Sequence, residues 1–186
     1  MSLMSTLEGL VAAGIDVVVV GGIASRLQGA TRVTDDVDVC YDTTASNERA
    51  LVDLMNKWHA YPRNLGPGRP WKLTLKELRG TGTVRLNTVH GALNLMRAVK
   101  GLGTYKDIVT MAEILTLGSG ATVPAANREQ MIRAKNAAGR PKDLEDVREL
   151  EAARELSHGD RRSTKRTENG TTIKGARRTG PSRQAP

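Results

Sequence analysis

The chain has no phenylalanine, two tryptophans and three tyrosines among its 186 residues. Modules that stack bases on an aromatic platform, such as RNA-recognition and OB-type domains, need more aromatic side chains than this. The single cysteine, Cys40, excludes an internal disulfide and a thiolate zinc site. A secreted disulfide framework and a zinc finger are therefore excluded, and a reducing compartment is expected.

Long apolar runs are absent as well. No uninterrupted apolar stretch approaches the ~18 residues that a membrane-spanning helix needs. The first positively charged side chain is Arg26, so the start lacks the basic region of a signal peptide. We therefore expect a soluble, cytoplasmic protein without a membrane partner, and the 39% hydrophobic content is that of a globular domain with a core.

Basic residues are present in excess, but they are unevenly distributed. The net charge is +8; residues 157–186 carry eight Lys/Arg against two acidic residues, a net +6, and residues 1–156 carry 20 against 18, a net +2. Residues 157–186 contain one large apolar residue, Ile173, so they cannot bury enough surface to offset the entropy of ordering. We expect a domain at 1–156 and a disordered basic tail at 157–186, which is either a solubilising extension or a nucleic-acid tether.

Hydrophobic spacing in the first third of the chain predicts helices that alternate with strands. The expected elements are a helix at 3–13 ended by Gly14, a strand at 17–20, a helix at 23–28 after a Gly21-Gly22 turn, a strand at 37–41, and a helix capped by Ser46 that carries Leu51, Leu54, Met55 and Trp58.

The remaining pattern predicts more strands and two C-terminal helices. Residues 59–70 are rich in proline and glycine, which indicates a loop and a candidate flap. The expected elements are strands at 71–75, 83–87 and 92–96, a short helix running into an edge strand at 105–115, a helix from the Asn127/Gln130 capping box to Gly139, and a helix from Pro141 with a stripe of Leu144, Val147, Leu150 and Leu156. The fold class is therefore α/β, a small mixed sheet of four to six strands with helices against one face.

Two features between Gly21 and Val39 point to chemistry. A strand followed by Gly21-Gly22 and a helix lets backbone N–H groups approach a phosphate, although such pairs often only turn the chain. Asp36 and Asp38 project to one face of a strand, where two carboxylates at about 4 Å repel by roughly 4 kcal/mol. Mg²⁺ or Mn²⁺ between these hard oxygen ligands removes the repulsion, and the alternative is a solvated acidic turn.

The stretch GGIASRLQGATRVTDDVDV (21–39) resembles the nucleotidyltransferase superfamily with the polymerase-beta-like fold. Together with GALNLMRAVKGLGTYKDI (91–108) and AKNAAGRPKDLEDVREL (134–150), it is similar to minimal bacterial members grouped with AbiEii-type toxins of type IV toxin-antitoxin systems. The resemblance covers about residues 3–156. It implies transfer of a nucleoside monophosphate from an NTP to a hydroxyl, with an RNA (tRNA) 3′ end, a protein side chain or a small molecule as acceptor, a toxin role, and a cognate antitoxin as partner.

The resemblance also assigns residues by position. Asp36 and Asp38 would ligate Mg²⁺ (or Mn²⁺) as catalytic residues, and the nucleotide would be bound by Gly21, Gly22, Ser25, Arg32, Thr34, Lys135, Arg140, Lys142 and Asp143. The C-terminal helical segment would close the cleft. Simpler roles stay open for three of them: Arg32 paired with Asp35, Lys135 solvated, and Asp143 favouring a helix N-terminus.

One position departs from the family pattern. Asn94 is predicted as the third catalytic residue, at a position where members commonly carry an acidic residue. An amide can weakly ligate a metal, but it cannot take a proton from an attacking hydroxyl. Loss of a general base typically costs about 10² to 10⁴ in rate. His90 is a candidate substitute. The alternatives are therefore a catalytically degenerate protein that binds nucleotide or a partner as a regulator, and a nucleic-acid-binding protein that acts through its basic tail.

Overall fold

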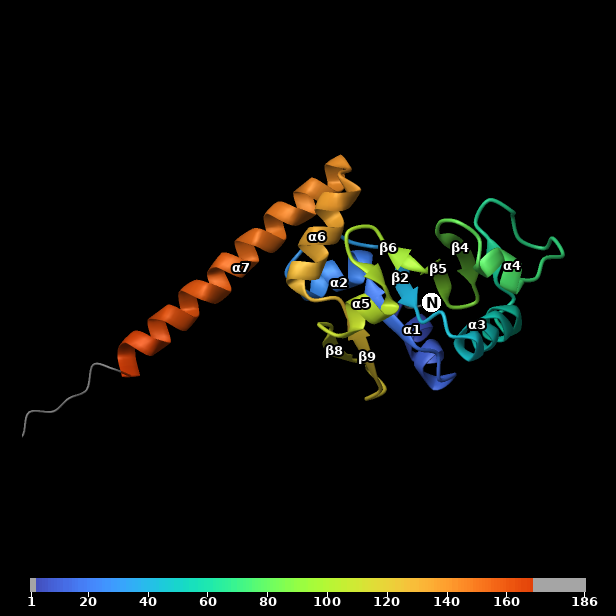
Figure 1. Ribbon diagram of the computed structural model, residues 1–186, viewed down its shortest axis with the longest axis horizontal. Helices are drawn as coiled ribbons and strands as arrows, with labels where there is room; N and C mark the ends of the chain where they lie inside the picture. The colour runs from blue at the N-terminus through green and yellow to red at the C-terminus, as the bar shows by residue number, and fades with distance from the viewer. Residues whose placement is uncertain (1–2, 169–186) are drawn as a thin grey trace, which may run out of the picture. The chain divides into compact units, whose positions relative to one another are not determined.

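The computed structural model of the protein describes the backbone of residues 3–168 and the side chains of residues 3–156 (Figure 1). The chain divides into two compact units, Met1–Ala153 and Arg154–Pro186. The sheet and the candidate site both belong to the first unit. None of the helices in the described part of the chain is both long and apolar enough to cross a membrane.

A seven-stranded mixed sheet forms the centre of the first unit, in the order β3-β4-β5-β2-β1-β9-β8. Strand β2 pairs antiparallel with β1 and parallel with β5, and β1 pairs parallel with β9. The strands are β1 (Val17–Val20), β2 (Asp36–Tyr41), β3 (Tyr61–Pro62), β4 (Val84–Thr88), β5 (Gly91–Met96), β8 (Glu113–Thr116) and β9 (Thr122–Ala125), with a separate two-stranded sheet of β6 (Ala98–Val99) and β7 (Gly103–Thr104).

Helices occupy the connections between these strands. They are α1 (Leu3–Ala12), α2 (Gly21–Leu27), α3 (Ala45–Lys57), α4 (Leu75–Leu78), α5 (Tyr105–Val109), α6 (Arg128–Ala138) and α7 (Pro141–Glu168). Figure 1 shows β5 and β4 on one side of β2, and α2 and α6 on the other.

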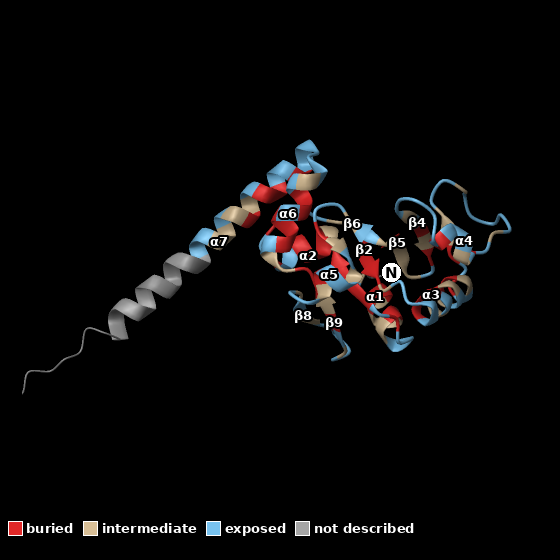
Figure 2. Cartoon of the chain, viewed as in Figure 1, coloured by how far each residue is buried: buried red, intermediate tan, exposed pale blue. Residues whose placement is uncertain are grey.

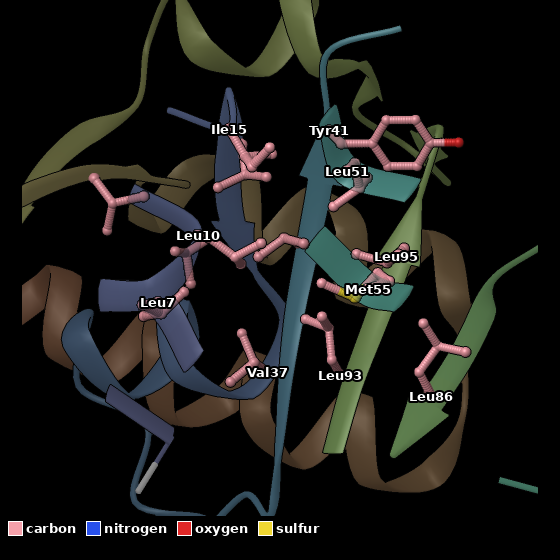
Figure 3. Close-up of a cluster of buried hydrophobic side chains, with 14 of the residues drawn as sticks. Leu7, Leu10, Ile15, Val37, Tyr41, Leu51, Met55, Leu86, Leu93 and Leu95 are labelled. Carbon is pink, nitrogen blue, oxygen red and sulfur yellow. The ribbon is translucent and has the colours of Figure 1, made fainter. Parts of the chain in front are cut away.

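Strand β1 separates two hydrophobic cores. Its valines alternate, with Val17 and Val19 in one core and Val18 and Val20 in the other. The first core packs the sheet against α1 and α3, as the close-up in Figure 3 shows, and the second packs it against α5, α6 and α7. Helices therefore cover both faces, and the expectation of one covered face was wrong. A continuous Val17–Val20 run is typical of a strand that is buried on both sides.

The two cores fix the direction in which the polar residues of β2 and β5 point. Leu93 and Leu95 of β5 are fully buried in the first core, so Asn94 between them faces the second side of the sheet. A slip of one residue in register would turn both leucines out of the first core, and each buried leucine contributes about 2–5 kcal/mol relative to alanine. Figure 2 shows much of β2 in red, the colour of buried residues.

Several local predictions are confirmed. Helix α1 stops at Ala12 and is followed by Gly14 with φ +66°, and the strand at 17–20 has the expected bounds. Asn127 and Gln130 form the capping box of α6, which ends at the left-handed Gly139. The segment 105–115 is a helix, α5, followed by β8 at the edge of the sheet. The α/β class with a mixed sheet is therefore correct.

Other predictions were wrong in position. Helix α2 begins at Gly21 rather than after the glycine pair, and the N-cap of α3 is Thr44, not Ser46. Residues 71–75 do not form a strand, because the side chain of Thr74 accepts a hydrogen bond from the Glu77 N–H in a capping box that starts α4. The sheet has seven strands instead of four to six, since β3 and β9 were not expected.

The C-terminal part of the chain is helical beyond the predicted domain boundary. Helix α7 runs to Glu168, so residues 157–168 of the predicted disordered tail are helical, and residues 169–186 lie outside the described residues. Of the predicted stripe, Val147 and Leu150 are buried, whereas Leu144 and Leu156 are 43% and 77% exposed.

Candidate active site

The three residues predicted to be catalytic meet on one face of the sheet. In the parallel pairing of β2 with β5, Asp38 lies opposite Asn94. The Asn94 Nδ2 group donates hydrogen bonds to Asp36 Oδ2 at 3.0 Å and to Asp38 Oδ1 at 2.7 Å. Asp35 is exposed, precedes β2 and does not line the cleft, as expected for its position next to the pair.

The glycine pair packs directly against Asp38 and Thr34. Gly21 has φ +62°, and a Cβ atom built there would lie 2.0 Å from Asp38 Oδ2. A Cβ atom on Gly22 would lie 2.5 Å from Thr34, and the Gly22 N–H donates to the Asp38 carboxylate. Glycine is therefore required by close approach of α2 to the Asp-bearing strand, beyond the turning of the chain.

The two carboxylates differ in their tendency to ionise. Burial raises the pKa of Asp38, and this exceeds the opposing effect of the hydrogen bond from Asn94, while the neighbouring charge of Asp36 raises it further. Burial acts the same way on Asp36, but a 2.9 Å hydrogen bond from the Thr34 hydroxyl and the Arg63 guanidinium at 3.3 Å outweigh it and lower its pKa. Adjacent carboxylates with pKa values displaced in opposite directions are typical of functional sites.

A buried ion network lies beside the pair, on α6 and α7. Asp146 accepts two hydrogen bonds from Arg32, at 3.1 and 3.2 Å, and also pairs with Lys135. Asp143 pairs with Arg140 and lies 3.4 Å from Lys135 Nζ. Arg32 therefore pairs with Asp146 and not with Asp35. Lys135 is 5% exposed, so it is no solvated helix residue.

The network holds its two acidic residues in the charged form. Asp143 and Asp146 are 0% and 2% exposed. Burial works against their ionisation, but the hydrogen bonds and charges of Arg140 and Lys135 at Asp143, and of Arg32 and Lys135 at Asp146, lower both pKa values. Asp143 thus anchors cations as well as standing in the first turn of α7.

A cleft of about 910 Å³ opens over these groups. It is lined by eleven of the twelve predicted site residues: Gly21, Gly22, Arg32, Thr34, Asp36, Asp38, Asn94, Lys135, Arg140, Lys142 and Asp143. The exception is Ser25, which is buried and whose hydroxyl has no hydrogen-bond partner among the described residues. Residues of α6 and α7 form one wall, as expected of a C-terminal segment that closes the cleft.

Sequence reasoning missed five basic residues on the other wall, which are Arg63, Arg79, Arg85, Arg97 and Lys100. One signal was present for Arg85: antiparallel pairing of β4 with β5 places it opposite Asn94, on the same face. With Arg32, Lys135, Arg140 and Lys142, nine basic side chains line the cleft against the three carboxylates of Asp36, Asp38 and Asp143. His90 does not line it and instead packs its ring against Trp58, with centroids 4.6 Å apart.

The donor set fits a hard divalent cation that is completed by substrate oxygens. No group of three or more His, Cys, Asp and Glu side chains suited to a metal occurs in the described part of the chain. Mg²⁺ commonly takes one or two carboxylates together with phosphate oxygens, which Asp36 and Asp38 can supply. Asn94 Oδ1 is buried beside them without a hydrogen-bond partner in that same part, and it is a third oxygen of the kind that Mg²⁺ prefers.

Neither a protein-family model nor a curated protein matches the chain. Among solved structures, it is similar to the antibiotic-resistance factor ANT(2″)-Ia. The solution structure of that factor has 12% identity and a TM-score of 0.45, with 90% of this chain and 97% of that chain covered. Its crystal structure in complex with adenylyl-2″-tobramycin has 14% identity and a TM-score of 0.48, with 87% and 98% covered. Both likenesses are distant, and the function of this chain is inferred from its own site.

Proposed function

We propose that this protein is a Mg²⁺-dependent nucleotidyltransferase of the polymerase-beta-like superfamily, which moves a nucleoside monophosphate from an NTP to a hydroxyl. One observation carries the proposal: Asp36 and Asp38 share a face, and Asp38 packs against Gly21 and accepts a hydrogen bond from the Gly22 N–H, in a cleft lined by nine basic side chains. A paired carboxylate site suits a divalent cation, and the four basic side chains on or against α6 and α7, Arg32, Lys135, Arg140 and Lys142, suit a triphosphate.

The residues of the cleft divide into roles. Asp36 and Asp38 are the metal ligands, and Mg²⁺, when bound, supplies charge compensation for the phosphates and for the oxygens that attack and leave. Gly21 and Gly22 leave room for a phosphate chain close to the backbone. Lys142 is exposed and has no side-chain partner in the described part of the chain. Among the basic residues on the wall formed by α6 and α7, it is therefore the one best placed to contact a phosphate.

The other basic residues on the α6–α7 side of the cleft are ion-paired and bind the nucleotide in that state. Arg32, Lys135 and Arg140 each contact Asp143 or Asp146, so their charges are oriented by the network before any ligand arrives. Ordering cations in advance lowers the entropic cost of binding a polyanion. The roles proposed for Thr34 and Asp143 are to hold Asp36 and Arg140 in place, through hydrogen bonds that the described residues already form.

For the acceptor we propose an RNA 3′ end. The five basic residues on the β4–β5 side of the Asp pair favour an anionic acceptor over a neutral protein hydroxyl. The toxin role and the cognate antitoxin that the resemblance implies are part of the same proposal, and inspection of the neighbouring gene would test them.

A second candidate is a regulator that binds nucleotide without transferring it. The observation that favours it is the position of the Asn94 amide, whose N–H group already bridges both carboxylates. In that case nucleotide binds in the cleft, and no pyrophosphate is released.

The experiment measures NTP binding by calorimetry, with and without Mg²⁺, and pyrophosphate release in the presence of RNA. Asp36→Asn and Asp38→Asn should each abolish Mg²⁺-dependent binding or transfer while leaving the protein folded, because each removes a ligand and relieves repulsion. Asp35→Asn is the matched control, since it removes the same charge next to the cleft. NTP affinity in Mg²⁺ that is unchanged in both cleft variants would contradict the metal assignment.

A further inference from the structure

Glu48, a buried carboxylate outside the Asp pair, orients two of the basic residues in the cleft. Glu48 lies in the first turn of α3, and its side chain is 2% exposed. Its Oε2 atom accepts a 2.7 Å hydrogen bond from Arg79 Nε, and its Oε1 atom lies 3.9 Å from Arg97 Nη2. Arg97 Nη1 donates to the backbone carbonyl oxygen of Arg79 at 3.1 Å, so the Arg97 guanidinium is held by the Arg79 backbone as well as by the charge of Glu48.

This arrangement leaves donors for a ligand. The hydrogen bond from Nε leaves both terminal nitrogens of Arg79 without a protein partner in the described part of the chain. The side chains of Arg79 and Arg97 are 47% and 41% exposed, and both line the cleft. A buried carboxylate beneath two half-exposed arginines fixes their planes, and a fixed guanidinium is suited to bidentate recognition of a phosphate.

The place of the two arginines relative to the Asp pair indicates which group they bind. Arg97 follows Asn94 by three residues and lies just beyond the end of β5, so the Cα atoms of the two residues are about 10 Å apart at roughly 3.3 Å per residue. A substrate group bound by Arg97 lies about that far from the Asp pair, so it is not the group that reacts at Asp36 and Asp38. It belongs to a remote part of the substrate, on the β5 side of β2 and across that strand from Gly21 and Gly22.

We propose that Glu48 is a positioning residue that presents Arg79 and Arg97 to a backbone phosphate of the acceptor strand. The inference rests on the proposed nucleotidyl transfer to a hydroxyl acceptor and adds the subsite at which that acceptor is held. Binding energy from a remote phosphate places the acceptor hydroxyl at the reacting centre, since enzymes use remote contacts to orient the reacting groups.

The test uses the full chain and a fluorescein-labelled single-stranded RNA oligonucleotide, whose binding is followed by anisotropy over a range of salt. Arg79→Gln and Arg97→Gln should each weaken RNA binding by about 10- to 100-fold, the range for hydrogen bonds to charged groups. Each should also reduce the slope of log K against log salt by about 0.7 for one lost phosphate contact. Arg49→Gln is the control, because Arg49 is an exposed α3 residue that does not line the cleft.

Two variants of Glu48 separate positioning from charge. Glu48→Gln keeps the reach of the side chain and its hydrogen bond to Arg79, so RNA affinity should stay within about threefold of wild type. Glu48→Asp keeps the charge but withdraws the carboxylate by one methylene, so affinity should fall toward that of Arg79→Gln. In the Arg79→Gln/Arg97→Gln background, Glu48→Asp should have no further effect, since it acts through those arginines.

The outcomes are distinguishable from failure of the proposed function. NTP binding in Mg²⁺ should be unchanged in every variant of this subsite, and its absence from the wild type would contradict the nucleotidyltransferase proposal alone. RNA affinity equal to wild type in both arginine variants would overturn the subsite, as expected if the acceptor is a protein. Weaker RNA binding by Glu48→Gln than by Glu48→Asp would overturn the positioning role of Glu48, because RNA affinity would then depend on the charge of the side chain and not on its length.

Discussion

The side-chain amide of Asn94 donates a 2.7 Å hydrogen bond to the carboxylate of Asp38, across the parallel pairing of β5 with β2. The same amide nitrogen lies 3.0 Å from Asp36 Oδ2. An N–H dipole between two carboxylates offsets part of their repulsion, which is the task a cation performs more completely. Asn94 therefore makes the pair tolerable without metal, and it does so at a position where a carboxylate would make the apo site less stable.

Asn94→Asp should lower the stability of the metal-free protein and increase the stabilisation that Mg²⁺ gives. A third carboxylate beside Asp36 and Asp38 adds repulsion of roughly 4 kcal/mol per close pair at a surface-like dielectric, which Mg²⁺ relieves. We expect a lower melting temperature without Mg²⁺, a larger rise on adding it than in wild type, and faster pyrophosphate release if a general base is limiting, by up to about 10² to 10⁴. Asn87→Asp, on the neighbouring strand β4 and outside the cleft, is the control. Weaker NTP binding by Asn94→Asp in Mg²⁺ would instead favour the binding-only regulator.

Gly21→Ala should disable the site through a steric conflict with Asp38. The added Cβ atom would lie 2.0 Å from Asp38 Oδ2, so the carboxylate must move away from its position between Gly22 and Asn94. Gly14→Ala is a matched control because Gly14 has a similar φ of +66°, against +62° at Gly21, with nothing within 4 Å of its Cβ position. Both variants should lose comparable stability from backbone strain, about 1 kcal/mol or more. Only Gly21→Ala should lose Mg²⁺-dependent NTP affinity, and equal losses in the two variants would show that backbone strain, and not displacement of Asp38, lowers the affinity.

The centre of the site could be predicted because its information is local. Asp36 and Asp38 share a face through the two-residue period of a strand, and Gly21-Gly22 directly follows the strand that pairs with theirs. The capping box of Asn127 with Gln130 and the left-handed Gly139 are likewise set by neighbouring residues. Local chemistry of this kind is visible in a single sequence.

The ion-pair partners of the charged residues could not be predicted, because the partners are far apart in the sequence and only the tertiary fold brings them together. Arg32 meets Asp146 across 114 positions, and Glu48 meets Arg79 across 31. The choice between Asp35 and Asp146 as partner of Arg32 depends on where α7 packs, which periodicity does not reveal. The error at 71–75 has a different cause: the alternation of Trp71, Leu73 and Leu75 suggested a strand, and the Thr74/Glu77 capping box determined the local structure instead.

Asp146→Asn should destabilise the fold more than any exposed charge change on α7. Removing one partner of a buried ion pair leaves Lys135 without its nearest carboxylate and typically costs about 3–5 kcal/mol. Glu145→Gln, an exposed change next to it on α7, should cost less than about 0.5 kcal/mol. Chemical denaturation at neutral pH measures the free energy of unfolding of both variants. A small effect of Asp146→Asn would mean that water reaches the ion network and screens its charges.

The same network predicts how stability depends on acid. The pKa values of Asp143 and Asp146 are lowered in the folded state from the ordinary 3.8. The unfolded chain therefore takes up these protons first, and the stability that the two carboxylates contribute is complete above about pH 5 and is lost as pH falls through 3.8 and below. Wild type should lose stability steeply over that window, and Asp146→Asn less steeply. Parallel curves for the two proteins would contradict this assignment.

The basic C-terminal segment should bind RNA by charge alone, in proportion to the number of basic residues retained. Truncation after Glu168 removes four Lys/Arg and no acidic residue, and truncation after Leu156 removes eight Lys/Arg and two acidic residues. If each basic residue meets one phosphate, the slope of log K against log salt for single-stranded RNA should flatten by about 3 in the first case and about 6 in the second, at roughly 0.7 per contact. The apparent KM for RNA should rise in the same order, while NTP affinity should not change, because the cleft is formed by residues up to Asp143. Equal slopes for the full chain and both truncations would make the segment a solubilising extension and would leave RNA binding to the cleft.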